Sequence, residues 1–196
     1  MNLPNKKYNV IVIDPPWQIE KIKKRVRPNQ VDIAYPMMSL KEIMGIPIKE
    51  ITDDKCILFL WIIDKYLFNG KRILESWGFK YHLTMTWDKT NGLAMYGFNR
   101  QSEFILVGLK GKHNAYPPRK TIPTSFRAKS KKHSEKPIEF YKMIRHLEGS
   151  KIDIFARRRH EGFDAFGNQV DKDMQVTLLN PQLKILRPSY ATMLLL

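Results

Sequence analysis

Five stretches of the chain are rich in apolar and β-branched residues and are separated by stretches of more mixed character. Most of them are nearly continuously hydrophobic and do not alternate strictly between apolar and polar positions, which is typical of strands buried on both faces of a parallel sheet. We therefore predict strands at "YNVIVID" (8–14), "KCILFLWII" (55–63), "YHLTMTWD" (81–88), "EFILVGL" (103–109) and "KIDIFA" (151–156).

Three stretches between these strands carry the end signals of helices. Ser39 and Glu42 have the spacing of a capping box at the start of one stretch. Gly78 and Gly149 close the other two, and glycine commonly follows the last turn of a helix. We therefore predict helices over 39–45, 64–78 and 134–149.

The alternation of strands with helices predicts an α/β domain whose helices cover both faces of a mostly parallel sheet. A chain of 196 residues has the length of one domain, so we assign residues 1–196 to a single domain. In such sheets, ligands bind outside the carboxyl ends of the strands. Asp14 stands at the end of the first predicted strand and is the first candidate for a functional residue.

A large excess of basic residues adds a partner to this picture. Thirty-four lysines and arginines against nineteen acidic residues leave a net charge of +15, which favours a polyanionic partner, most simply nucleic acid. Much of this charge lies in two stretches that fit neither the strands nor the helices, 18–34 and 110–132. Long loops are usually functional or disordered, so both are candidate clamps on a phosphate backbone. The alternative is a merely basic surface with two solvated loops.

The remaining composition concerns the compartment. Cys56 is the only cysteine and lies inside an apolar stretch, so we predict that it is a core residue. Without a disulfide framework or a cysteine zinc cluster, the sequence favours a reducing, intracellular and cytoplasmic location. The first ten residues lack the apolar stretch of a signal peptide, and no stretch has the roughly 20 apolar residues of a membrane span. We therefore predict no membrane partner.

The tetrapeptide "DPPW" (14–17) follows the first strand with residues that continue a sheet poorly. Asp14 offers a hydrogen-bond acceptor, and the two prolines hold a backbone carbonyl as a second one. Trp17 offers a flat face on which a base can stack. Two acceptors beside such a face suit the exocyclic amine of adenine, because they stabilise the positive charge that develops as its nitrogen attacks. The alternative is a strand followed by a proline turn, with Trp17 in the core.

Four motifs along the chain are "DPPW" (14–17), "YPMMSLKEI" (35–43), "HSEKP" (133–137) and "FARRRHEGFDAFGNQ" (155–169). In this order they resemble the MT-A70 family of adenine-N(6) DNA and RNA methyltransferases. The sequence is most similar to the compact bacterial and phage-type members of that family. The resemblance covers roughly residues 8 to 170.

The resemblance implies a Rossmann-like methyltransferase fold with a circularly permuted motif order, in which "DPPW" precedes the main cofactor-binding segments. It implies S-adenosylmethionine as the methyl donor and no metal. The catalytic residues it implies are Asp14, Pro15, Pro16 and Trp17. Asp14 and Pro15 engage the target amine, Trp17 shapes the base pocket, and Asp14 also belongs to the cofactor-binding set.

Lys136 is a candidate on physical grounds as well. We predict that it lies in the first turn of the helix over 134–149, where the macrodipole disfavours a cation and invites an anionic partner. The resemblance implies that this partner is the carboxylate of the cofactor. The alternative is that the neighbouring Glu135 masks the charge locally.

Three further cofactor contacts are implied near the last predicted strand. The side-chain amides of Asn168 and Gln169 suit ribose hydroxyls, and the resemblance assigns them that role. Gly167 lets the backbone turn sharply beside them. Arg157 is a candidate for the rim of the cofactor site. By itself, "GNQ" would be an ordinary turn.

Two residues are implied on the substrate side. Tyr35 occupies the matched aromatic position of "YPMM", and Glu103 matches an acidic residue that the family places near the base pocket. The alternatives are a loop tyrosine that packs on the core and a glutamate at a strand end on the surface. The tail from 170 to 196 matches no motif and stays unassigned.

We therefore predict an S-adenosylmethionine-dependent enzyme that methylates the N(6) amine of adenine in nucleic acid. DNA is favoured over RNA by analogy with the compact members of the family. The basic loops are predicted to contact the nucleic acid, and the enzyme to act alone or as a homo- or hetero-oligomer. The alternative is a catalytically silent nucleic-acid-binding subunit of a methyltransferase complex.

Overall fold

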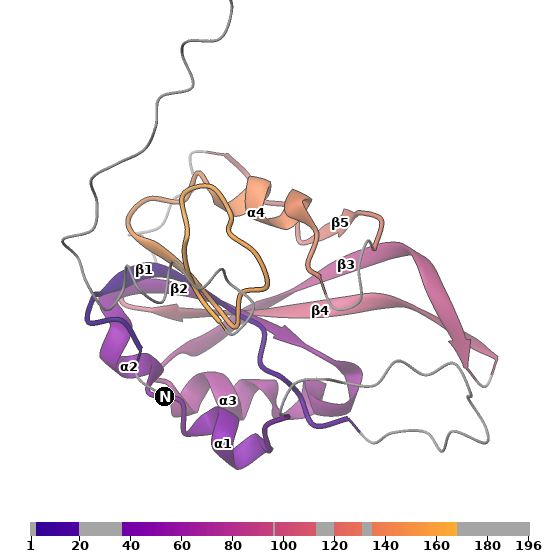
Figure 1. The fold of residues 1–196 in the computed structure, drawn as a ribbon, viewed down its shortest axis with the longest axis horizontal. Helices are drawn as coiled ribbons and strands as arrows, with labels where there is room; N and C mark the ends of the chain where they lie inside the picture. Colours follow the sequence, from indigo (N-terminus) through magenta and orange to yellow (C-terminus); the bar gives the residue numbers. More distant parts are fainter. Residues whose placement is uncertain (1–2, 20–36, 96, 113–119, 131–134, 168–196) are drawn as a thin grey trace, which may run out of the picture.

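The computed structural model of the chain describes residues 3–19, 37–95, 97–112, 120–130 and 135–167 (Figure 1). Most of the basic stretch 18–34, parts of 110–132 and the tail 170–196 lie outside the described residues. The assignment of residues 1–196 to a single domain stays a prediction.

A single sheet runs through the described part of the chain. Its strands are β1 (Tyr8–Ile13), β2 (Thr52–Ile62), β3 (Lys80–Met95), β4 (Phe98–Lys110), β5 (Ser125–Arg127), β6 (Lys151–Ile154) and β7 (Asp164–Phe166). They lie in the order β5-β3-β4-β2-β1-β6-β7. Four neighbouring pairs are parallel, whereas β4 runs antiparallel to both β2 and β3. The predicted class, α/β with a mostly parallel sheet, is confirmed.

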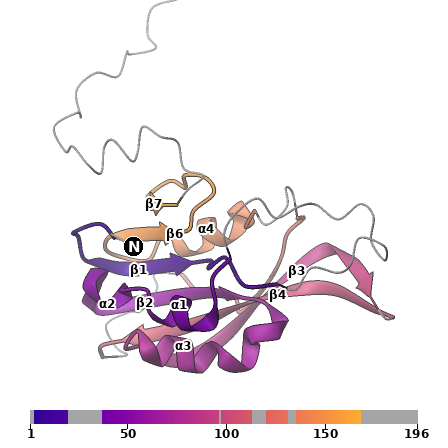
Figure 2. The same ribbon diagram turned by 60° about the horizontal axis from the view of Figure 1, so that its bottom comes forward.

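Helices cover both faces of the sheet, as predicted. One face carries α1 (Leu40–Met44), α2 (Ile48–Ile51) and α3 (Gly70–Ser76), with the 3₁₀ helix η1 (Asp64–Asn69) directly before α3. The other face carries α4 (Ile138–Ile144) (Figures 1 and 2). Among the described residues, no helix has the length and apolar character needed to cross a bilayer.

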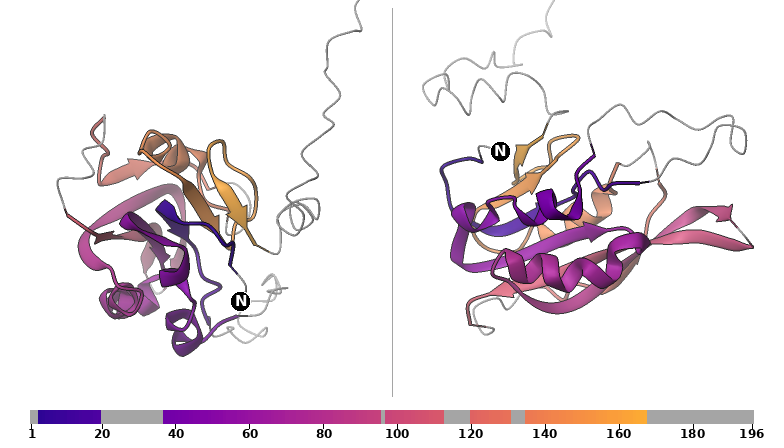
Figure 3. Two further views of the ribbon diagram at one scale, coloured as in Figure 1. Left: turned by 90° about the vertical axis from the view of Figure 1, so that its left-hand side faces the viewer. Right: turned by 90° about the horizontal axis from the view of Figure 1, so that it is seen from below.

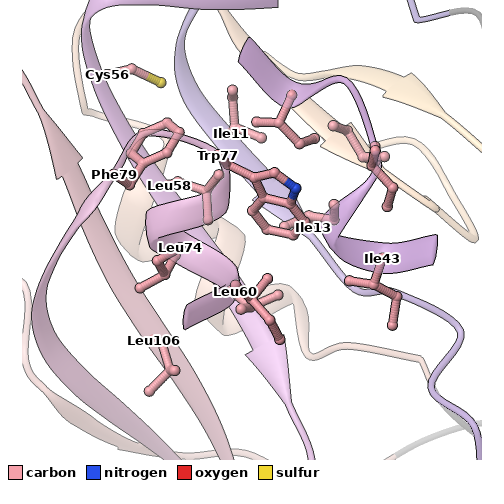
Figure 4. Packing of buried hydrophobic residues seen from close by; sticks show 14 of the residues in the cluster. Ile11, Ile13, Ile43, Cys56, Leu58, Leu60, Leu74, Trp77, Phe79 and Leu106 are labelled. Atoms are coloured by element: carbon pink, nitrogen blue, oxygen red, sulfur yellow. The ribbon is translucent and has the colours of Figure 1, made fainter. Parts of the chain in front are cut away.

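The central strand β1 is buried on both of its faces. Ile11 and Ile13 pack into the core beneath α1 to α3 (Figure 4). Val10 and Val12 pack into the core beneath α4. Each of these four side chains is at most 1% exposed, and full burial of one such side chain contributes about 1.5–3 kcal/mol. A strand between two cores has no polar face, which explains why its sequence does not alternate.

The strands β3 and β4 are longer than their apolar stretches predict. The structure continues β3 past Asp88 to Met95 and begins β4 at Phe98, with Gly97 in the turn at a φ of 80°. The resulting hairpin projects beyond the rest of the sheet (Figures 1 and 3). Hydrophobic patterning missed this extension because pairing between the two strands, and not burial of a face, extends the ladder there.

The sequence analysis placed the basic stretch 110–132 outside the strands and helices, and this prediction is wrong for part of it. Residues 125–127 form β5, which pairs in parallel with β3 at the edge of the sheet. The Nε atom of Arg127 lies 2.8 Å from Oδ2 of Asp88, so this arginine already has an anionic partner. A strand of three residues is too short to show periodicity, so hydrophobic patterning could not predict it.

The helix predicted over 134–149 is shorter in the structure and begins after Pro137. Lys136 therefore precedes the helix, and its predicted place in the first helical turn is wrong. The physical reason is Pro137, which disfavours the helical conformation in the residue before it. The capping box of Ser39 and Glu42 is confirmed at the start of α1.

Candidate active site

The carboxyl ends of β2, β1 and β6 meet at one edge of the sheet because these neighbours run parallel. Asp14 follows the last residue of β1, and its backbone N–H donates to the carbonyl of Ile154 at the end of β6. The predicted position of Asp14 at the end of a buried strand is thereby confirmed. The Asp14 carboxyl group therefore lies at this edge of the sheet.

The two prolines form a tight corner after Asp14. The backbone N–H of Trp17 donates to the carbonyl of Pro15 at 2.8 Å, an i to i+2 bond of the γ-turn kind. The N–H of Met38 donates to the carbonyl of Pro16, also at 2.8 Å. A carbonyl oxygen has two lone pairs, so the Pro15 oxygen keeps one for a ligand. The corner is thus fixed by backbone hydrogen bonds as well as by the proline rings.

Four charged side chains from different strands and segments form a chain of alternating sign beside this corner. Nζ of Lys136 lies 3.3 Å from Oδ1 of Asp14 and 2.9 Å from Oε2 of Glu103. Nζ of Lys89 lies 3.3 Å from the other oxygen of Glu103. Nζ of Lys136 also lies 4.7 Å from the ring centroid of Trp61, a cation–π distance. We call Asp14, Lys136, Glu103 and Lys89 the ionic chain.

The ionic chain changes the acidity of its members. Burial raises the pKa of Asp14, and Glu103 adds to that rise, while Lys136 opposes it. Burial lowers the pKa of Lys136, but Asp14 and Glu103 together outweigh burial and raise it. Burial raises the pKa of Glu103, yet Lys136 and Lys89 bring it below its usual value. The lysine is therefore charged at neutral pH, and the charge on Asp14 depends on its presence.

Aromatic residues enclose the other side of the corner. Trp17 is 5% exposed and stacks on Tyr66, with ring centroids 5.1 Å apart and an interplanar angle of 25°. Its indole N–H donates to the carbonyl of Trp61 at 3.2 Å, and the Tyr66 hydroxyl donates to the carbonyl of Gln18. Trp17 therefore belongs to the hydrophobic core, which confirms the structural part of the alternative given for this motif. Its role towards a base stays a prediction.

A second group of charges lies beyond the end of β6. Nη1 of Arg158 lies 2.6 Å from Oε1 of Glu135, so Glu135 neutralises Arg158. The alternative that Glu135 masks Lys136 is wrong, because Lys136 pairs with Asp14 and Glu103. A cavity of about 20 Å³ is lined by Asp14, Lys136, Glu135, Arg158 and Arg157. Arg157 also lowers the pKa of Asp14.

The same cavity has a buried polar wall that the sequence analysis missed. Asp153 on β6 is 3% exposed and accepts a hydrogen bond from the Tyr141 hydroxyl at 2.8 Å. Burial raises the pKa of Asp153 to about 8, against the effect of that hydrogen bond. The His160 ring stacks on Tyr141, and burial lowers the pKa of His160 to about 4. The aspartate inside the otherwise apolar "KIDIFA" was the available signal.

A glycine lets the last described segment approach the end of β6 closely. A Cβ at Gly167 would lie 2.5 Å from the carbonyl oxygen of Ala156. Phe155, the residue before Ala156, has a φ of 64°. This conformation is uncommon for a bulky residue, and such conformations cluster at functional sites. The turn after β6 and the end of β7 are therefore held together at the edge that carries Asp14.

The structure brings several predicted site residues together and leaves others outside its described part. Asp14, Glu103 and Lys136 are in contact, with Pro15, Pro16 and Trp17 at the adjoining corner and Arg157 at the same cavity. Tyr35, Asn168 and Gln169 lie outside the described residues, so their roles stay predictions. Trp61 and Tyr66 were missed, because a strand tryptophan and a helical tyrosine carry no local signal of function.

The fold and site define a class: an α/β enzyme domain with a rigid acidic corner and a buried cation at the carboxyl edge of its sheet. The MT-A70 family pattern matches residues 8–169, and the chain belongs to this family. The predicted family and the predicted enzyme class, adenine-N(6) methyltransferase, are confirmed.

Known relatives differ in how much of their length the chain covers. It is 32% identical over 189 residues to the Type II methyltransferase M.MunI of Mycoplasma, covering 86% of this chain and 80% of that protein. It is 28% identical to the human N(6)-adenosine-methyltransferase catalytic subunit METTL3, covering 89% of this chain but 30% of the relative. It is 27% identical to the human N(6)-adenine-specific methyltransferase METTL4, covering 87% of this chain and 39% of that protein.

Proposed function

We propose that this chain transfers the methyl group of S-adenosylmethionine to the N(6) amine of adenine in nucleic acid, with DNA as the preferred substrate. The observation that carries this proposal is the pairing of Asp14 with the buried Lys136 beside the locked Pro15–Trp17 corner. DNA is preferred because the chain spans most of the compact Type II relative but less than half of the adenosine and adenine relatives compared above.

The described residues fit the charges of S-adenosylmethionine. Lys136 and Arg157 would hold its carboxylate, and the Nε atom of Arg158 is a buried donor without a hydrogen-bond partner among the described residues. When bound, S-adenosylmethionine supplies a methyl group on a sulfonium, which makes that carbon electrophilic. Among the described residues, these donors lie with Asp14 around the same small cavity.

The residues of the chain activate the amine by accepting its hydrogens. The Asp14 carboxylate and the free lone pair of the Pro15 oxygen each take one N–H, which favours a pyramidal nitrogen and stabilises the positive charge that grows on it. Burial raises the pKa of Asp14, and Lys136 opposes that rise, so the lysine favours the ionised form. No general base has to act before the attack, because the extra proton leaves the nitrogen afterwards.

The test combines methyl transfer with binding of the methyl donor. Labelled methyl is transferred from S-adenosylmethionine to DNA and to RNA, and the nucleosides are then analysed. We expect N(6)-methyladenine in DNA, no product with Asp14→Ala, and retained heat of binding of S-adenosylmethionine for that variant. Asp54→Ala serves as the control, because Asp54 is an exposed acid at the start of β2.

Each other outcome has a defined meaning. Full activity of Asp14→Ala would overturn the mechanism, and product on another base would overturn the adenine assignment. Product on RNA alone would reverse the preference for DNA. Binding of DNA without binding of S-adenosylmethionine would instead support the silent subunit of a methyltransferase complex.

A further inference from the structure

An open cavity of about 520 Å³ lies next to the ionic chain and takes no part in the mechanism above. Ile62 at the end of β2 and Asp64 at the start of η1 line it on one side, and Arg100 and Ser102 of β4 line it on the other. Lys89 joins the two sites, because it lines this cavity and lies 3.3 Å from Glu103. The cavity therefore leads towards the candidate active site.

The side of the cavity that is formed by β4 continues into the projecting hairpin of β3 and β4. Phe98, Arg100 and Ser102 are alternate residues of one strand, so their side chains point to the same face of the sheet. Phe98 lies about 13 Å beyond Ser102 along that strand and is 77% exposed. No described residue forms an ion pair with Arg100. The hairpin that carries this row extends past the rest of the sheet (Figure 3).

The side of the cavity that is formed by η1 also combines a basic residue with an exposed phenylalanine. Lys65 lines the cavity from η1, and Phe68 follows three residues later in the same 3₁₀ helix. Residues three apart in a 3₁₀ helix eclipse each other, so Phe68 lies directly above Lys65 along the helix. Phe68 is 97% exposed. Each of the two elements, η1 and β4, thus carries a cation that lines the cavity and an exposed phenyl ring farther along the element.

This grouping of exposed apolar side chains is not a random scatter over the described surface. Of the five large apolar residues exposed there, Ile19 lines the cavity, and Phe68 and Phe98 lie on η1 and β4, two elements that contribute lining residues. Aromatic rings next to cations are the combination by which proteins hold single-stranded nucleic acid, with bases stacked on the rings and phosphates at the cations. We call Lys65, Phe68, Phe98 and Arg100 the aromatic rim.

We propose that the aromatic rim binds the nucleotides on either side of the target adenine, with their bases stacked on Phe68 and Phe98 and their phosphates at Lys65 and Arg100. This proposal rests on the proposed function for the identity of the central base. Stacking on a side chain requires that a flanking base leave its neighbour in the strand. The preferred substrate is therefore an unpaired or locally opened strand.

The experiment measures binding to a strand that cannot be methylated on adenine. The full chain is titrated into a fluorescently labelled DNA octamer containing only thymidine, and the anisotropy is followed. Loss of one stacked base costs about 1–3 kcal/mol, so we expect Phe98→Ala and Phe68→Ala each to bind at least about 5-fold more weakly. Phe98→Trp keeps a stacking face and is expected to restore binding.

Tyr81→Ala is the matched control. Tyr81 is an exposed aromatic residue of β3 whose partner in the pairing of the strands is Gly108, far from the hairpin tip. We expect wild-type affinity for this variant. Circular dichroism of all variants checks that the fold is retained, so a loss of binding in Phe98→Ala with a native spectrum supports the proposal.

The remaining outcomes separate this proposal from the proposed function. Unchanged affinity of Phe68→Ala and Phe98→Ala, or absence of binding by the wild type, would overturn the aromatic rim even if adenine in DNA is methylated. Weakened binding of both variants by a chain that methylates nothing would support the rim and overturn the proposed function. Loss of self-association in Phe98→Ala, with unchanged binding of DNA, would assign the ring to a protein contact and overturn the proposal.

Discussion

The ionic chain and the aromatic rim are both charged, and they lie next to each other, but their charges are held in opposite ways. Lys136 is 11% exposed and lies between two carboxylates. Arg100 is exposed and forms no ion pair with a described residue. Lys89 belongs to the ionic chain and also lines the cavity of the rim.

This difference shows what each region is suited to do. A buried charge is costly unless it is paired, so the ionic chain holds its members in one arrangement and sets their pKa values. An exposed charge is hydrated and screened, so it contributes little to folding and is available to a phosphate. The first arrangement suits chemistry on one base, and the second suits binding of a strand.

The largest effect is expected from removing the buried cation. Lys136→Met leaves the largely buried Asp14 and Glu103, 18% and 24% exposed, without their shared partner, and breaking a buried pair costs up to about 3–5 kcal/mol. We expect the free energy of unfolding at neutral pH, measured in urea, to fall by that amount. Lys71→Met is the control, because Lys71 pairs with Glu75 on the surface and its loss costs under about 1 kcal/mol. Equal effects of the two substitutions would show that burial does not distinguish the regions.

The pH dependence of stability tests the buried wall behind the ionic chain. The folded-state pKa of Asp153 is about 8, above its ordinary value of 3.8, so the unfolded chain loses this proton first as pH rises. Its contribution to stability is therefore complete below about pH 4 and is lost as the pH rises towards 8. Asp153→Asn keeps an acceptor for Tyr141 and removes the titration. We expect a flatter curve of unfolding free energy between pH 4 and 8, and an unchanged curve would contradict the assignment.

A smaller effect is expected on the pH profile of methyl transfer. Glu103 raises the pKa of Asp14, so Glu103→Gln removes that contribution and leaves Lys136 to act on Asp14 alone. In the proposed mechanism the ionised form of Asp14 accepts the hydrogen of the amine, so the acid limb of the rate profile should move to lower pH. The control Glu75→Gln lies on α3 and should leave the profile in place. A shift to higher pH would show that Glu103 acts mainly by holding Lys136 in position.

The smallest effect is expected at the rim. Arg100→Gln removes one phosphate contact, so the plot of log affinity for single-stranded DNA against log salt should become shallower by about 0.7. The free energy of unfolding should stay within about 0.5 kcal/mol of the wild type, because the residue is exposed. Lys71→Gln, on the surface of α3, should leave the salt slope unchanged. A large loss of stability in Arg100→Gln would place this residue with the ionic chain instead.

Features carried by continuous local patterns could be predicted from the sequence. The apolar stretches located β1, β2 and β6, the capping box located α1, and "DPPW" located the corner after Asp14. The prediction ended β3 too early and left β5 out, because both depend on pairing with distant strands and not on apolar residues of their own. The predicted place of Lys136 in a helical turn was wrong, because Pro137 disfavours the helical conformation in the residue before it.

Residue patterns and the resemblance to the MT-A70 family were enough to predict the class of the fold, the rigid corner, and Asp14, Lys136 and Glu103 as candidate site residues. The pairing of these three side chains could be seen only in the folded chain, because they are separated by up to 122 positions and meet where β1, β4 and the segment before α4 converge. The folded structure also shows that Trp17 stacks on Tyr66 and that η1 and β4, which carry Phe68 and Phe98, contribute residues to one cavity. Local periodicity reports which face of an element is buried, whereas a site depends on which elements the folded sheet places side by side.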